Sequence, residues 1–456
     1  MNAQAEAVAL RQPRAVRAAG RAVPRAGNLR WWLFAGFILL GSLIFHSKID
    51  PGDRELLRQG VSGINGSWYQ NQWIARLTPS DFVIGFFAYA AAVHRFRRRR
   101  VAFSRLATRL TLLVALCVAV GVATGIYHNT ASPAGDWREL FVGGLFAFGL
   151  WATVMTSDAA SLRFAQLFVA LVTGYGALQL AEYARGGGEL AFYGRTPVGD
   201  HATLEFMVAA VAISLAMLRS GRSRLLWLAG ITIGTAIVML AFRRYAWVEL
   251  AIVAAFFPLL SKRRARYLKA AALLAGAGAL AIVLTWSSLQ WGERFASLDP
   301  TASRSTNALA ATNQGHLDDI RDGLDQVRAH PVFGLGVGVL YVGKRTVAWK
   351  GAAGMVHNAP VEVWIKFGLL GLMTYALIYA TLFRRLWQRR GGTRYADLVA
   401  WGVFAFFLAN FFISITVYSW PFGDSERGVL FFGLLAAAFP RLEEQEQSRI
   451  SLRRAA

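Results

Sequence analysis

About twelve apolar runs are the feature that most constrains how this 456-residue chain can fold. Most runs are about 17 to 25 residues long, which is the length at which an α-helix crosses the hydrocarbon core of a bilayer. A soluble domain is excluded, since 55% of the residues are hydrophobic and only 16% are charged. The runs predict an all-α polytopic membrane protein with spans near 31–46, 79–94, 108–127, 139–157, 162–183, 202–218, 225–242, 245–260, 268–288, 358–382, 396–417 and 426–440.

The basic residues lie on one side of this predicted topology. The net charge is +23, and with the N-terminus inside, Lys and Arg gather in the cytoplasmic tails and loops, as in Arg11 to Arg30 and Arg95 to Arg109. This asymmetry is the positive-inside pattern of membrane proteins. The charge therefore sets the topology, with both termini cytoplasmic, and does not indicate a nucleic-acid site.

The spans divide the chain into five predicted regions. They are a cytoplasmic basic tail at 1–30, nine transmembrane helices in 31–288, a large periplasmic loop at 289–357, three transmembrane helices in 358–440 and a cytoplasmic tail at 441–456. A loop as long as the periplasmic one is usually functional. Its stretch HLDDIRDGLDQVRAH has apolar residues at three- to four-residue spacing, which predicts an amphipathic helix on or near the membrane face: Leu317, Ile320, Leu324 and Val327.

Four charged residues lie inside predicted spans, each about four to nine residues from the outer end: Glu205, Glu249, Glu362 and Lys366. Intramembrane charge is a functional-site hypothesis by default, and four such residues at one depth predict a polar cavity open to the outside. Glu362 and Lys366 have an alternative role, because their i,i+4 spacing suits an ion pair that holds the helices together.

A cluster of arginines is predicted at the outer surface. Arg243 and Arg244 lie at the turn between two spans and break the positive-inside pattern, and Arg195 lies in the outer loop before the sixth span. Snorkelling explains one such arginine, but two adjacent guanidiniums at a tight turn indicate a bound anion. Three guanidinium forks suit a diphosphate better than a carboxylate, because a diphosphate offers more oxygens to paired donors.

The tenth span begins with the unusual sequence HNAPVEVW. Asn358 is predicted to cap the helix, and Pro360 fits its first turn. His357 would then lie just outside the helix and face the same cavity as the arginines, where an imidazole suits proton transfer at neutral pH. The alternative is a histidine that only forms a hydrogen bond with the loop.

These motifs resemble the O-antigen ligase family, which also takes in O-antigen polymerases and bacterial O-oligosaccharyltransferases. The similar pieces are HPVFGLGVG at 330–338, HNAPVEVWIKFGLLG at 357–371 and the Arg-bearing hairpin RRYAW at 243–247. The chain departs from the pattern at His316, where many polymerase-like members carry Arg.

The resemblance implies an enzyme with a glycosyltransferase type C-like fold in the bacterial inner membrane. Its active site would face the periplasm. It implies transfer of O-antigen glycan from undecaprenyl diphosphate to lipid A core oligosaccharide, with inversion at the anomeric carbon. On this reading His357, Arg244 and Arg195 are catalytic. The residues expected to bind substrate are Arg243, Asn358, Glu249 and His316.

Cofactors and partners follow from the same reading. No metal or other cofactor is expected, because the outer segments show no DxD-like pair and no His/Cys cluster. The expected partners are the lipid-linked donor, the lipid A core acceptor and membrane lipids, with no nucleic acid. The alternatives are an O-antigen polymerase or a protein O-oligosaccharyltransferase of the same superfamily. A glycan or anion transporter is less favoured, since it should also need charged or broken helices on the inner half.

Overall fold

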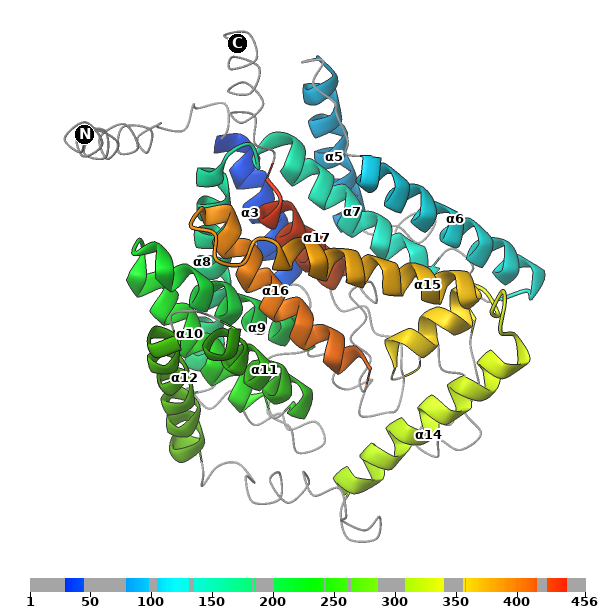
Figure 1. Ribbon diagram of the computed structural model, residues 1–456. Coiled ribbons are helices and arrows are strands. Elements are labelled where there is room, and N and C mark those ends of the chain that lie inside the picture. The colour runs from blue at the N-terminus through cyan, green and yellow to red at the C-terminus, as the bar shows by residue number, and fades with distance from the viewer. Residues whose placement is uncertain are drawn as a thin grey trace, which may run out of the picture.

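The computed structural model describes residues 29–44, 79–97, 105–130, 135–182, 184, 201–241, 243–260, 264–285, 308–339, 356, 358–415 and 425–440. All regular secondary structure within these ranges is helical (Figure 1). Apart from one short 3-10 helix at Leu218–Ser220, the helices are α3 (Leu29–Ile44), α5 (Pro79–Arg97), α6 (Arg105–Tyr127), α7 (Gly135–Thr153), α8 (Asp158–Glu182), α9 (His201–Met217), α10 (Arg224–Leu240), α11 (Arg244–Leu260), α12 (Arg264–Thr285), α14 (Ala308–Ala329), α15 (Ala359–Trp387), α16 (Tyr395–Ser414) and α17 (Ser425–Ala438).

A helix occupies each of the twelve segments that the sequence predicted as spans. Within the described residues, five helices are long and apolar enough to cross a membrane by length and composition: α6, α8, α9, α15 and α16. The helical architecture is therefore confirmed, and it agrees with a polytopic membrane protein. That all twelve helices cross the bilayer, with a periplasmic loop between the ninth and tenth, stays a prediction.

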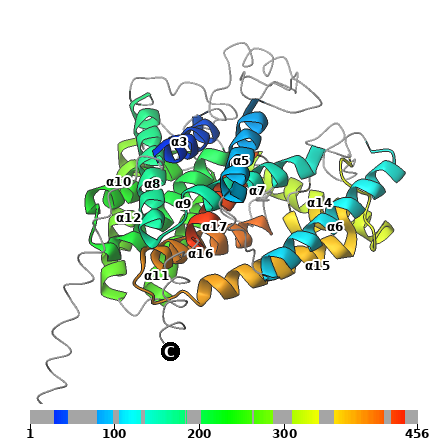
Figure 2. The ribbon, with the colours of Figure 1, turned by 90° about the horizontal axis from the view of Figure 1, so that it is seen from above.

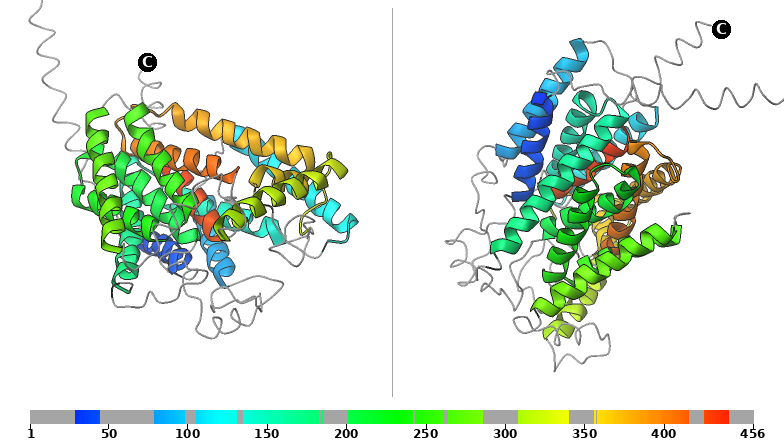
Figure 3. Two further views of the ribbon diagram at one scale, coloured as in Figure 1. Left: turned by 90° about the horizontal axis from the view of Figure 1, so that it is seen from below. Right: turned by 90° about the vertical axis from the view of Figure 1, so that its left-hand side faces the viewer.

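The main bundle is built around α9 and α16. Residues 203–217 of α9 are all buried, as are most residues of α16. Around them pack α3, α5, α7, α8, α10, α11, α12 and α17, whose buried residues join one hydrophobic core. Figure 3 shows α3 and α5 together at one edge of this bundle, where the rings of Phe34 and Phe87 stack with centroids 5.6 Å apart.

Three helices form a wing beside the main bundle: α6, α14 and α15. In Figure 2, α6 and α15 run side by side away from the other helices, with α14 beneath them. The wing has its own small apolar clusters, one of which joins Val327 of α14 to Val361 and Ile365 of α15. It meets the bundle where α15 packs on α16, as in the contact between the rings of Tyr379 and Phe411.

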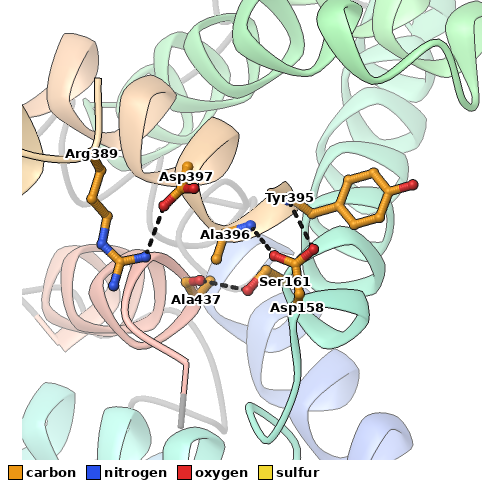
Figure 4. Close-up of polar contacts among 7 residues, drawn as sticks. All are labelled: Asp158, Ser161, Arg389, Tyr395, Ala396, Asp397 and Ala437. Carbon is orange, nitrogen blue, oxygen red and sulfur yellow. Dashed lines mark hydrogen bonds and ion pairs between the residues drawn. The ribbon is translucent and has the colours of Figure 1, made fainter. Parts of the chain in front are cut away.

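Polar contacts join α8, α16 and α17 at the end that is predicted to face the cytoplasm (Figure 4). No side chain of α16's own N-cap residue closes the helix start. Instead, the carboxylate of Asp158, in the first turn of α8, accepts hydrogen bonds from the backbone N–H groups of Tyr395 and Ala396, at 3.1 and 2.8 Å. A carboxylate is stabilising there, since the N-terminus of a helix carries unsatisfied donors and partial positive charge.

The tenth predicted span is not one straight helix. At Gly368 the backbone has φ 64° and ψ −164°, so α15 consists of two helical halves at an angle (Figure 1). A Cβ built on Gly371 would lie 3.3 Å from the carbonyl oxygen of Val363, although the two residues would be about 12 Å apart along a straight helix. The first half, up to Phe367, therefore folds back over the second. The second half, from Leu369 to Trp387, extends about 28 Å and alone approaches the bilayer thickness.

Candidate active site

The first half of α15 begins with the cap that the sequence predicted. The Asn358 Oδ1 atom accepts a hydrogen bond from the backbone N–H of Val361, at 2.9 Å, and Pro360 lies in the first turn. The Asn358 Nδ2 atom donates to the carbonyl oxygen of Ile415, at 2.6 Å. Asn358 therefore both closes α15 and ties its start to the end of α16.

Glu362 and Lys366 form the predicted ion pair. The Lys366 Nζ atom lies 2.5 Å from Glu362 Oε1, and both side chains are more than nine-tenths buried. The other carboxylate oxygen, Glu362 Oε2, accepts a hydrogen bond from the backbone N–H of Val356, at 2.7 Å. The depth expected for these two residues assumed a straight span. The break at Gly368 corrects this, because it places both in a short helix that packs between α14 and the second half of α15.

The Gly-rich turn at 334–338 fills the break in α15 with backbone contacts. The N–H of Leu335 donates to the carbonyl of Ile365 at 2.6 Å, and the N–H of Leu369 donates to the carbonyl of Val332 at 3.0 Å. These bonds satisfy groups that an unbroken helix would pair internally. On the other side of the turn, the N–H of Val337 donates to the carbonyl of Gly121 in α6, at 3.0 Å.

Only glycine fits at three positions of this junction. Gly334, Gly336 and Gly368 all have positive φ. A Cβ on Gly334 would overlap the carbonyl oxygen of Ile365, and one on Gly336 would overlap the backbone of Gly125. The glycine-rich sequence is thus explained by close backbone packing between α6, α14 and α15, and not by a nucleotide loop.

The helix predicted in the large loop is present as α14, which starts about two turns earlier than expected. Of the four predicted apolar residues, Leu317 is not covered by other helices, since it is 51% exposed. Ile320, Leu324 and Val327 pack against Val361 and Ile365 of α15. Most of this stripe is therefore covered by the first half of α15. That α14 lies on or near the membrane face stays a prediction.

The arginine hairpin joins α10 to α11. Arg243 occupies the cap position of α11, since its carbonyl accepts from Ala246 N at 3.0 Å, and Arg244 is the first helical residue. The Trp247 Nε1 atom donates to the carbonyl of Val238 at 3.0 Å and so holds the two helices together across the turn. Both arginine side chains are partly exposed. Two guanidiniums at the positive end of a helix dipole form a favourable place for an anion.

α16 connects the helix that follows this hairpin with α15, because it packs against both α11 and α15 (Figures 1 and 2). Phe256 of α11 contacts Trp401 and Phe404 of α16. In the predicted topology α11 runs inward and α16 runs outward. From that contact the helices extend about 18 Å to Arg244 and about 15 Å to Ser414. The predicted topology would therefore place the arginine hairpin and the Asn358 cap at the same end of the bundle.

The remaining site residues are less fully placed. Arg195 and His357 lie outside the described residues, and His316 lies in α14 but its side chain is not described. Glu249 and Glu205 are at most 1% exposed, in α11 and α9 of the main bundle. The roles of these residues, and a polar cavity shared by the four intramembrane charges, stay predictions.

The sequence reasoning missed the residues that join the motifs to one another. Ile415 and Val356 showed no signal, because each contributes a backbone group. Gly368 and Gly371 did show one, since two glycines in FGLLG interrupt an otherwise helical pattern and mark a position of close backbone approach. Within the described residues, no group of three His, Cys, Asp or Glu side chains could hold a metal ion.

A single family model matches the segment of the chain that contains most of these motifs. Residues 209–376 match the sequence model of the family described as O-antigen ligase. The matched segment contains the arginine hairpin, α14, the Gly-rich turn and the first half of α15. A search of curated proteins found no match. This match confirms the resemblance of the motifs to the O-antigen ligase family over residues 209–376.

Proposed function

We propose that this chain is an O-antigen ligase, which transfers O-antigen glycan from undecaprenyl diphosphate to the lipid A core oligosaccharide at the periplasmic face of the bacterial inner membrane. The family match over residues 209–376 carries the proposal, because this one segment holds both the Arg243–Arg244 hairpin and the His357–Asn358 motif. Geometry supports it further, since the predicted topology brings the two motifs to one end of the bundle.

In the proposed reaction an acceptor hydroxyl attacks the anomeric carbon of the donor. The bond from that carbon to the diphosphate oxygen breaks, and undecaprenyl diphosphate leaves. Arg244, with Arg195 and Arg243, would hold the diphosphate and offset the negative charge that develops on the leaving group. Direct attack inverts the anomeric centre.

His357 has two candidate roles in this reaction. As a general base it would take the proton from the acceptor hydroxyl. Alternatively, it would orient the diphosphate. Glu249, His316 and Asn358 are proposed to contact the substrates, although the polar atoms of Asn358 also have protein partners, in Val361 and Ile415.

The test is a reconstituted transfer reaction. Purified protein is supplied with a lipid-linked glycan donor and, in separate reactions, with lipid A core oligosaccharide, a second lipid-linked glycan or an acceptor protein. A product on lipid A core alone supports the ligase. Extension of the second lipid-linked glycan would identify a polymerase, and glycan on the protein would identify an O-oligosaccharyltransferase. Absence of product with every acceptor would contradict the proposed function.

A further inference from the structure

The two chain neighbours of His357 are fixed by side chains of the first half of α15. The backbone N–H of Val356 donates to Glu362 Oε2 at 2.7 Å, and the carbonyl of Val356 accepts from the N–H of Asn358 at 2.7 Å. Asn358 in turn accepts from Val361 and donates to Ile415. The chain is therefore held immediately before and immediately after position 357.

Glu362 does more than a helix-stabilising ion pair requires. An i,i+4 pair with Lys366 needs only one carboxylate oxygen, and Oε1 provides it. The second oxygen, Oε2, reaches back beyond the helix start to Val356. A hydrogen bond to an ionised acceptor is about twice as strong as one between neutral groups, so this bond restrains the segment firmly.

Lys366 supports that bond through Glu362. The two side chains are 9% and 5% exposed, and an ionised carboxylate in so buried a place needs an opposite charge close by. Lys366 supplies the charge from one turn further along the same helix. Removing it should weaken the acceptor strength of Glu362 even though Lys366 does not touch Val356.

We propose that Glu362, with Lys366 as its counterion, is a positioning residue that fixes the backbone on the N-terminal side of His357, while Asn358 fixes the C-terminal side. The inference rests on the proposed function for its catalytic meaning. It predicts that disturbing either charged residue alters the surroundings of His357 in particular and not the fold in general.

The first measurement does not need catalysis. The full-length protein, in its wild-type, Glu362→Gln and Lys366→Met forms, is treated with diethyl pyrocarbonate, which acylates imidazole nitrogens. Mass spectrometry follows the modification rate of each histidine. We expect the rate at His357 to change about threefold or more in both variants, because weakening the bond from Val356 to Glu362 frees the chain immediately before this position. The rates at His94, His128 and His330 should stay within about twofold. An unchanged rate at His357 in both variants would overturn the inference, whether or not the protein transfers glycan.

The second measurement uses the transfer reaction. Glu362→Gln should lower turnover by about tenfold to a hundredfold, as expected for a misplaced catalytic group, while donor affinity changes less than about threefold. In a His357→Ala background the same change should cost almost nothing further. An equal loss in both backgrounds would show that Glu362 serves only the fold. Asp397→Asn, which breaks the distant Arg389–Asp397 pair, is the matched control and should leave turnover unchanged. A wild-type protein without product would contradict the proposed function alone.

Discussion

Asn358 and Glu362 illustrate how much of this site is encoded residue by residue. The cap formed by Asn358 and the pair formed by Glu362 and Lys366 could both be predicted, because each depends on residues three or four positions apart. The bonds from these side chains to Val356 and Ile415 could not, since they depend on the path of the chain outside the helix. Local spacing therefore predicts the interactions of these side chains within their own helix. The tertiary structure determines which further backbone groups they bind.

Arg244→Lys separates guanidinium geometry from charge. If Arg244 grips a diphosphate with paired donors, lysine keeps the charge but loses the fork, and we expect a cost of about 2 kcal/mol, or roughly thirtyfold in turnover with the lipid-linked donor. Arg224→Lys, at the exposed start of α10 that is predicted to face the cytoplasm, is the control and should leave turnover unchanged. Full activity of Arg244→Lys would mean that Arg244 only snorkels to the membrane surface.

His357→Ala distinguishes the two roles proposed for the imidazole. A general base predicts that turnover falls about a hundredfold while donor binding stays nearly intact. A group that orients the diphosphate predicts weaker donor binding instead. Donor affinity and single-turnover rates, measured on protein with unchanged thermal unfolding, decide between them. If neither quantity changes, His357 has no part in the reaction.

The helices are the scale at which the sequence predicted most and missed one decisive feature. Apolar run length located every described helix of the main bundle to within a few residues, because lipid and core both select uninterrupted apolar stretches. The same criterion read α15 as a single span, since both of its halves are apolar. The break at Gly368 is stabilised by the Gly-rich turn, which lies some thirty residues earlier in the chain. Hydropathy carries no information about such a partner.

Gly368→Ala should disrupt the wing. The backbone conformation at Gly368 is nearly exclusive to glycine, and an added Cβ would overlap the carbonyl oxygen of Val332. We expect a loss of about 3 kcal/mol or more in the free energy of unfolding, read as a lower thermal midpoint in detergent. Gly276→Ala, in open space on α12, is the matched control and should be neutral or slightly stabilising. Equal midpoints for the two variants would argue against the break.

Asp158→Ala should weaken the junction of α8 with α16 without touching the site. Loss of a helix cap costs about 1 to 2 kcal/mol, and the carboxylate here accepts from two backbone N–H groups. Asp158→Asn retains an acceptor and should cost about half as much. Thermal unfolding gives both values. Glycan transfer by either folded variant should match that of the wild type, and a selective loss of transfer would mean that this junction also shapes the outer end.

At the scale of the whole molecule, the structure divides into a main bundle and a wing. The bundle buries α9 and α16 almost completely, whereas α6 in the wing exposes Leu112 and Leu116 on its surface. Exposed leucines on a helix long enough to span a membrane are suited to contact with lipid. The division between bundle and wing could not be predicted, because both are made of helices with the same apolar composition.

The orientation of the chain can be tested with reporter fusions. A reporter placed after residue 320 should be periplasmic and one placed after residue 390 cytoplasmic, because the positive-inside pattern puts Arg384, Arg385 and Arg390 on the cytoplasmic side. Alkaline phosphatase and green fluorescent protein, which are active on opposite sides, give complementary signals. The reverse pattern would place the arginine hairpin and α14 in the cytoplasm, away from any lipid-linked glycan.

Main-chain contacts between the Gly-rich turn and α15 leave most of the neighbouring side chains free to diverge among homologues. Val332 and Phe333 are 56% and 64% exposed although the carbonyl of Val332 anchors the second half of α15. Homologous chains should therefore keep glycine at positions 334, 336 and 368 while these exposed positions exchange freely. Distant relatives would then be easier to recognise by the spacing of their glycines than by any reactive side chain.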